Sequence, residues 1–197
     1  MRLLVVDDDS PSRYLLESVF SARGHQVDSA ADGRDALDKA RLNPPDMVIT
    51  DILMPRMDGY RLCIEWHEDA RLSGIPFVFY TATYVEDADE SFALTLGADA
   101  FLRKPMDSPS LVHAIEDIQR SRRPGRRSGR AKASDETGVL REYNDRLVSK
   151  LEKKVAHLQA ANAELRTAIE LLTDEVGVKD TLIRRLNEEL AARESTR

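Results

Sequence analysis

Five side chains in this sequence have the chemistry to hold a metal ion and a phosphoryl group. Asp7 and Asp8 directly follow an apolar run near the N-terminus, and Asp51 follows a second apolar run. Three carboxylates brought close together repel one another, so we expect a divalent cation between them. Mg²⁺ suits such a site because it prefers hard oxygen ligands and leaves coordination positions open. Thr81 and Lys104, which follow two later apolar runs, would supply the hydroxyl and ammonium groups that bind phosphoryl oxygens.

Each of these residues alone has a structural interpretation that needs no ligand. A strand-end aspartate such as Asp51 can cap a helix, Thr81 can do the same, and Lys104 can form a surface ion pair. Their shared position favours a site, because all five follow predicted strands at the carboxyl end. Open α/β sheets bind their ligands at that edge.

The elements that must position these residues are five apolar runs that alternate with five segments of helical spacing. We expect strands at 2–6, 25–27, 47–50, 75–80 and 99–103, and helices at about 10–24, 33–42, 58–69, 86–96 and from 108 onward. This alternation predicts an α/β fold with a doubly wound, five-stranded parallel sheet. Right-handed crossovers favour the flavodoxin-like strand order 2-1-3-4-5, in which strands one and three are neighbours. Asp7 and Asp8 would then meet Asp51.

The first helix has a predicted cap and a predicted buried face. Ser10 is expected to cap the helix, with Pro11 at its first position. Helical spacing predicts that the helix packs inward through Tyr14, Leu15, Val19 and Phe20.

Several motifs over residues 1 to about 121 resemble the receiver domain of two-component response regulators. They are Val6-Asp7-Asp8, Asp51-x-x-Met-Pro-x-Met-Asp-Gly59, Thr81-Ala82 and Gly97-Ala-Asp-x-Phe101-x-x-Lys104-Pro105. The resemblance implies that Asp51 accepts a phosphoryl group from a histidine kinase or a histidine phosphotransfer protein. It also implies that Asp8, Asp51 and the backbone carbonyl of Leu53 bind Mg²⁺ directly, while Asp7 acts through water.

The same resemblance assigns roles at the last two strands. Thr81 and Lys104 would bind the phosphoryl oxygens, and Phe101 would fill the space that Thr81 leaves. Many relatives carry Tyr at the position of Phe101. Because Phe101 has no hydroxyl, we do not expect a hydrogen bond at this position to signal the switch to partners. The bond between Lys104 and Pro105 is expected to be cis.

The segment 122–138 is predicted to be a basic linker. Residues 120–138 hold seven basic and two acidic side chains, whereas residues 1–119 hold 22 acidic and 11 basic ones. A basic DNA-binding helix ahead of a zipper is the alternative, but Pro124, Gly125, Gly129 and Gly138 argue against one continuous helix. We therefore expect no specific nucleic-acid binding.

Residues 139–192 are predicted to form a parallel homodimeric coiled coil, followed by a tail at 193–197. Apolar residues recur at heptad spacing, with β-branched residues at position a and Leu at position d, a combination that favours two parallel strands. Asn162 at an a position fits a contact that specifies register. A long amphipathic helix packed on the receiver is the alternative, and the number of heptads argues against it. The predicted dimer seam consists of Val148, Leu151, Val155, Leu158, Asn162, Leu165, Ile169, Leu172, Val176, Ile183 and Leu186.

Composition also limits the cellular location and the class of protein that we expect. Cys63 is the only cysteine, and no signal peptide or membrane span is expected, so we predict a cytoplasmic protein without membrane partners. The predicted function is a phosphorylation-switched response regulator and not an enzyme, beyond Mg²⁺-dependent self-phosphorylation and slow dephosphorylation. The alternative is the N-terminal regulatory part of a larger protein with a kinase or cyclic-dinucleotide output.

Overall fold

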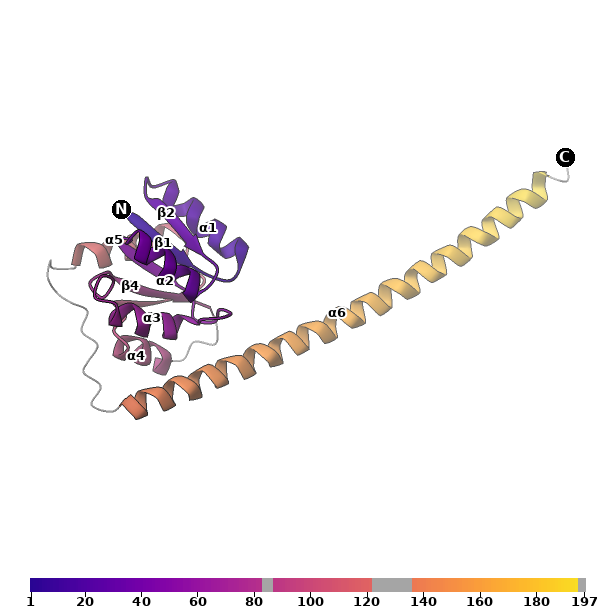
Figure 1. Cartoon of the computed structure of the whole chain (residues 1–197). Helices are drawn as coiled ribbons and strands as arrows, with labels where there is room; N and C mark the ends of the chain where they lie inside the picture. The colour runs from indigo at the N-terminus through magenta and orange to yellow at the C-terminus, as the bar shows by residue number, and fades with distance from the viewer. Residues whose placement is uncertain (83–86, 122–135, 195–197) are drawn as a thin grey trace. The chain divides into compact units, whose positions relative to one another are not determined.

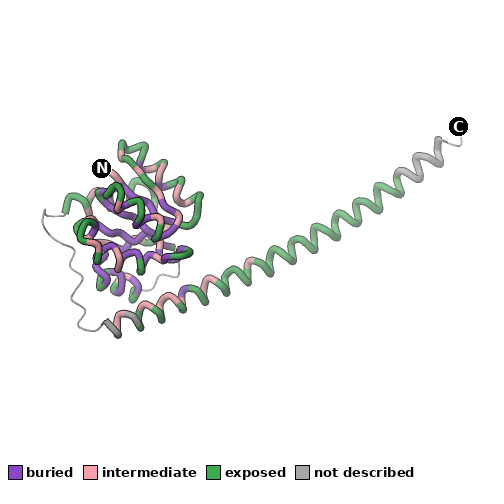
Figure 2. The backbone as a smooth tube through the Cα atoms, viewed as in Figure 1, coloured by how far each residue is buried: buried purple, intermediate pink, exposed green. Residues whose placement is uncertain are grey.

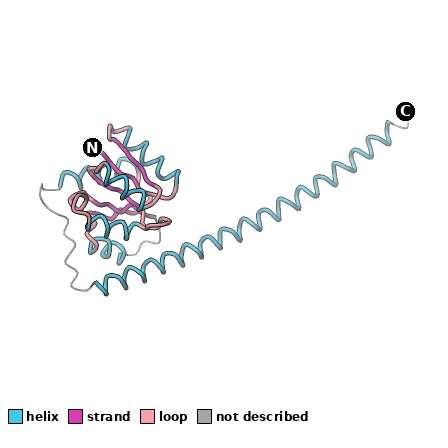
Figure 3. The backbone as a smooth tube through the Cα atoms, viewed as in Figure 1, coloured by secondary structure: helices cyan, strands magenta, loops and turns pink. Residues whose placement is uncertain are grey.

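The computed structural model describes residues 1–82, 87–121 and 136–194. The chain divides into two compact units, Met1–Lys150 and Leu151–Arg197. Helices and strands alternate along the first unit (Figure 3). The elements are β1 (Arg2–Val6), α1 (Ser10–Ser21), β2 (Gln26–Ala30), α2 (Gly33–Leu42), β3 (Met47–Thr50), α3 (Gly59–Glu68), β4 (Phe77–Thr81), α4 (Asp87–Thr95), β5 (Ala100–Arg103), α5 (Ser108–Ser121) and α6 (Glu136–Glu194).

The five strands form one parallel sheet in the order β2-β1-β3-β4-β5, which confirms the predicted topology. In the register of the central pair, Val6 lies opposite Thr50. The residues that follow these two strands therefore emerge side by side. Lys104 follows β5 in the same way, next to the end of β4, because Thr81 lies opposite Arg103.

Both faces of the sheet are covered by helices, so side chains that alternate along a strand enter two different cores (Figure 1). Leu3 and Val5 of β1 join the cluster that α1 and α5 complete. Leu4 and Val6 join the cluster on the opposite face, which α2, α3 and α4 complete. Because both faces are covered, the central strands β1, β3 and β4 are buried along almost their whole length, as is typical of parallel sheets.

Two predictions about α1 need correction. Asp9, not Ser10, caps α1, since its carboxylate accepts a hydrogen bond from the backbone N–H of Ser12 at 2.9 Å. The helix packs inward through Leu16 and Phe20, whereas Tyr14 and Leu15 are exposed. The rotation of a helix about its axis depends on the surface that it covers, and spacing alone did not distinguish Leu15 from Leu16.

Two strands also differ from their predicted ranges. β2 runs on to Ala30 because it pairs with all of β1. β4 begins at Phe77 rather than Ile75, because Ile75 closes a turn onto Leu72 and Pro76 has no N–H to donate to the ladder.

The first turns of α6 belong to the same compact unit as the sheet. Val139, Tyr143 and Leu147 are partly buried against the core on the side of α2, α3 and α4. Figure 2 shows that half-buried and exposed residues alternate near the start of α6, whereas the described residues farther along are almost all exposed. These three side chains thus contact the receiver core, and the coiled coil over residues 139–192 stays a prediction.

The second unit is the remainder of α6, a continuous helix from Leu151. Along the described part of the predicted seam, the large apolar side chains are between 47% and 60% exposed. Gly177 does not interrupt the helix, and Lys179 pairs with Glu175 one turn earlier. Among the described residues, no helix is long and apolar enough to cross a membrane.

Candidate functional site

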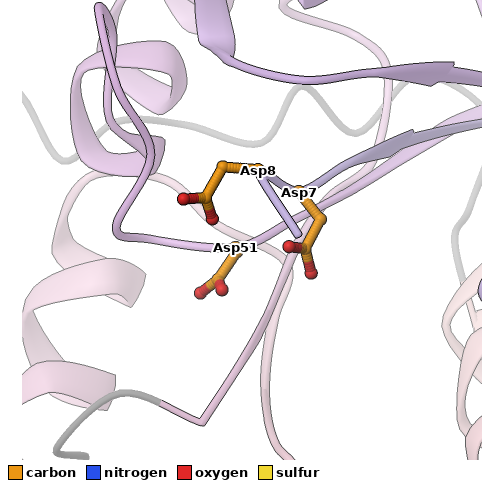
Figure 4. Close-up of side chains that lie close together, drawn as sticks. All are labelled: Asp7, Asp8 and Asp51. Atoms are coloured by element: carbon orange, nitrogen blue, oxygen red, sulfur yellow. The ribbon is translucent and has the colours of Figure 1, made fainter. Parts of the chain in front are cut away.

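The three predicted aspartates meet at the carboxyl edge of the sheet (Figure 4). Asp7 and Asp8 follow β1, and Asp51 follows β3, where its backbone N–H donates to the carbonyl of Val6 at 2.8 Å. Each of the three side chains offers a carboxylate oxygen, and these oxygens all lie within 4.8 Å of one another. The parallel register of the two central strands thus places three acidic groups together.

Lys104 closes the cluster from the side of β5. Its Nζ lies 2.5 Å from Oδ2 of Asp7 and 3.5 Å from Oδ2 of Asp51. The backbone holds this position, because the N–H of Lys104 donates to the carbonyl of Thr81 at 2.8 Å. The peptide bond between Lys104 and Pro105 is cis. One cation is therefore shared between two carboxylates.

Burial and charge act in opposite directions at this cluster. Asp7 is only 2% exposed, and its burial raises the pKa of its carboxyl group, although the ion pair with Lys104 opposes the rise. Burial by itself would lower the pKa of Lys104, but the charges of Asp51 and Asp7 outweigh it and leave the pKa above its ordinary value. The ammonium group therefore stays charged beside the carboxylates.

The three carboxylates differ in how they are held. Asp7 is buried, accepts the N–H of Asp9 and binds Lys104. Asp8 is exposed. Asp51 is half-buried, and its Oδ1 accepts the N–H of Ile52 at 2.6 Å, which orients the carboxylate. Of the two carboxylates beside Lys104, Asp51 is the less buried one.

The loop after Asp51 is tightly constrained. Asp58 caps α3 through the N–H of Arg61, and Gly59 donates its N–H to the carbonyl of Ile52 at 2.8 Å. Leu53, whose carbonyl is the predicted third ligand, is buried in this loop. This geometry holds the loop close to the carboxylates.

A second set of contacts at this loop was missed by sequence reasoning. Arg56 has a positive φ of 63°, and its guanidinium lies against the buried carboxylate of Asp32. Next to it, Gly33 donates its N–H to the carbonyl of Met57 at 3.0 Å. Asp32 caps α2, which the Asp-Gly pair could have indicated, but its partner on the loop has no local signature.

Thr81 and Phe101 lie on the two strands next to the aspartates. Thr81 is fully buried as the last residue of β4. Phe101 is buried on β5, with its ring centroid 6.1 Å from that of Phe79. The structure thus places Thr81 at the site edge and Phe101 in the core beside β4.

The acidic cluster fits a hard divalent cation. Three carboxylates offer oxygen atoms that all lie within 4.8 Å of one another, and Asp8 is exposed to water. This donor set is the kind that Mg²⁺ accepts, because Mg²⁺ retains several water ligands and needs few protein oxygens. A cation there would also relieve the repulsion that Lys104 only partly offsets.

Residues 3–116 match the family model of the response regulator receiver domain. The chain belongs to this family. A receiver of the same fold, the chemotaxis protein CheY4 of Vibrio cholerae, superimposes with a TM-score of 0.56 at 26% identity, over 59% of this chain and 97% of that one. Protein PilH of Pseudomonas aeruginosa is 34% identical over 117 residues, which are 59% of this chain and 96% of PilH.

Longer relatives match over the receiver as well. The protein named "Probable transcriptional regulator ycf27" of Cyanophora paradoxa is 38% identical over 119 residues, which are 60% of this chain and 48% of that protein. The chain thus spans about half the length of such curated relatives. The family match identifies residues 3–116 as a response regulator receiver domain.

Proposed function

We propose that Asp51 accepts a phosphoryl group from a phosphohistidine of a histidine kinase or phosphotransfer protein. The observation that carries this proposal is the position of Asp51, a half-buried carboxylate with Lys104 Nζ at 3.5 Å from its Oδ2. A carboxylate oxygen of Asp51 attacks phosphorus, the bond from phosphorus to the histidine nitrogen breaks, and an acyl phosphate forms. The other nitrogen of the phosphohistidine ring carries a proton, so the donor leaves as neutral imidazole.

The residues around Asp51 have separate roles in this proposal. Bound Mg²⁺, held by Asp8, Asp51 and the carbonyl of Leu53, with Asp7 acting through water, would neutralise the charge of the transferred group. Lys104 exchanges part of its contact with Asp7 for a phosphoryl oxygen. Thr81 turns its hydroxyl to another phosphoryl oxygen, and Phe101 moves into the space that it leaves.

The proposed assembly is a parallel homodimer through α6. Its predicted seam exposes about half of each large apolar side chain, and a contiguous apolar stripe of this length is typical of an interaction surface. A second copy of the same helix buries that stripe by knobs-into-holes packing. Phosphorylation would then change partner binding or the arrangement of two receivers on one dimer, in the cytoplasm and without specific nucleic-acid binding.

A direct test measures phosphoryl transfer to Asp51 by intact mass. The full chain with acetyl phosphate and Mg²⁺ should gain one phosphoryl group, and the gain should disappear with EDTA and in Asp51→Asn. Asp8→Ala should weaken Mg²⁺ binding strongly because it removes a proposed direct ligand. Labelling of Asp51→Asn at the wild-type level would disprove the assignment.

A further inference from the structure

The first three turns of α6, Val139–Lys150, are called here the docked segment, because they contact the receiver elements α3 and α4. Its apolar side is formed by Val139, Tyr143 and Leu147, which recur every four residues and pack against the receiver core. The heptad seam enters it only at Val148, since the a and d positions before Val148 are Arg141 and Asn144. The docked segment is therefore built for the receiver and not for the coiled coil.

A buried ion cluster anchors the docked segment to α4. Asp89 of α4 is 4% exposed and Lys150 is 2% exposed, and Lys150 Nζ donates to Oδ2 of Asp89 at 2.7 Å. Arg146 Nη1 lies 3.1 Å from Oδ1 of Asp89, and its guanidinium stacks over the ring of Phe92 at 5.3 Å. A carboxylate is buried here only because two cations of the docked segment cover it.

A second anchor ties the docked segment to α3. The hydroxyl of Tyr143 donates to Oδ2 of Asp58 at 2.7 Å, and the Tyr143 ring packs edge-on against Tyr60 with centroids 6.5 Å apart. Tyr60 completes the link between the two anchors, because its hydroxyl lies 3.3 Å from Oδ1 of Asp89. One rigid helix thus holds α3 and α4 at a fixed spacing.

Both anchors are connected to the acidic cluster at the edge of the sheet. Asp58 ends the loop that begins at Asp51, and it caps α3 through its other carboxylate oxygen. Asp89 lies on α4, which follows Thr81 in the chain and pairs with β5 through Asp87 and Arg103 at 2.7 Å. Arg103 is the neighbour of Lys104. Asp51 is therefore linked to the Asp58 anchor through its loop, and Lys104 is linked to the Asp89 anchor through the ion pair of Arg103 with Asp87.

We propose that Val139–Lys150 is an intramolecular latch on the α3–α4 face, and that phosphorylation of Asp51 releases it. This inference rests on the proposed function. When Thr81 moves toward the phosphoryl group, α4, which follows β4 in the chain, shifts relative to α3. Tyr143 and Lys150 are about 10 Å apart along one helix, so they cannot both follow such a shift. Docking and phosphorylation oppose each other, and by linkage each weakens the other equally.

The test uses the full chain with beryllium fluoride and Mg²⁺ as the acyl-phosphate mimic. In the wild type, hydrogen exchange of residues 139–150 should speed up when the mimic binds. The double variant Arg146→Met, Lys150→Met should exchange fast without the mimic and bind it about fivefold more tightly, because the latch no longer opposes binding. Amide shifts of β5 report the affinity. The matched control Arg141→Met, at an exposed position of the same helix, should bind within twofold of the wild type.

A milder variant keeps the test valid if the double variant misfolds. Tyr143→Phe keeps the ring contact with Tyr60 and removes only the hydroxyl that binds Asp58, so its affinity should rise in the same direction by a smaller factor. Wild-type affinity in both the double variant and Tyr143→Phe, with Asp51 labelled normally by acetyl phosphate, would overturn the latch and leave the proposed function intact. A wild type that fails to label at Asp51 would overturn both.

Discussion

Gly59 is the position where one added methyl group should disturb both the stability and the site. A Cβ at Gly59 would lie 2.2 Å from the carbonyl oxygen of Asp51 and 3.0 Å from Cα of Ile52. Both neighbours are backbone atoms and cannot rotate away. Since ordinary contact begins at 3.4 Å, the start of α3 and the loop after Asp51 must separate by about 1 Å in Gly59→Ala.

The cost of this separation follows from the contacts that it breaks. The hydrogen bond from Gly59 N–H to the carbonyl of Ile52, now 2.8 Å, would be lost, which costs about 1 kcal/mol. Overpacking strain adds about 1–3 kcal/mol. The free energy of unfolding should therefore fall by about 2–4 kcal/mol. Phosphoryl acceptance by Asp51 should also slow, because its carbonyl is the atom that must move.

Urea denaturation followed by the fluorescence of Trp66, the single and buried tryptophan, measures the change. With a slope of about 2 kcal/mol per molar urea, the midpoint should fall by about 1–2 M. Gly74→Ala is the matched control, since nothing lies within 4 Å of its Cβ, and its midpoint should stay within about 0.3 M of wild type. An unchanged midpoint in Gly59→Ala would refute the steric reasoning.

Two further outcomes are expected from the proposed switch and the proposed dimer. Thr81→Ala should still take up a phosphoryl group but fail to reposition Phe101, because the hydroxyl supplies the contact that differs between the two states; equal β5 amide shifts in variant and wild type on binding beryllium fluoride would contradict this. Asn162→Val should raise the thermal midpoint of α6 by removing a polar pair from the seam, while sedimentation should show oligomers beyond the dimer. A full chain that sediments as a monomer at micromolar concentration would disprove the coiled coil.

The sheet and the acidic site could be predicted because their signals are local and repeat along the chain. Each strand is a short apolar run, and each predicted site residue follows such a run directly. Strand order follows from the handedness of the crossovers. Given that order, Asp7, Asp8 and Asp51 must share an edge, and the structure brings their carboxylates together. Predicting the position of Lys104 required one further inference, because the pairing of β5 with β4 is what places Lys104 beside the aspartates.

Only the tertiary structure showed which contacts link distant parts of the chain. Tyr143 binds Asp58 from 85 residues away, and Lys150 binds Asp89 from 61 residues away. Neither pair has a sequence signature, because a single tyrosine or lysine on a helix is equally suited to solvent. Val139, Tyr143 and Leu147 recur every four residues, but this spacing does not indicate which surface they contact. An amphipathic helix specifies that one side must be buried, while the surface that buries it is decided by the rest of the fold.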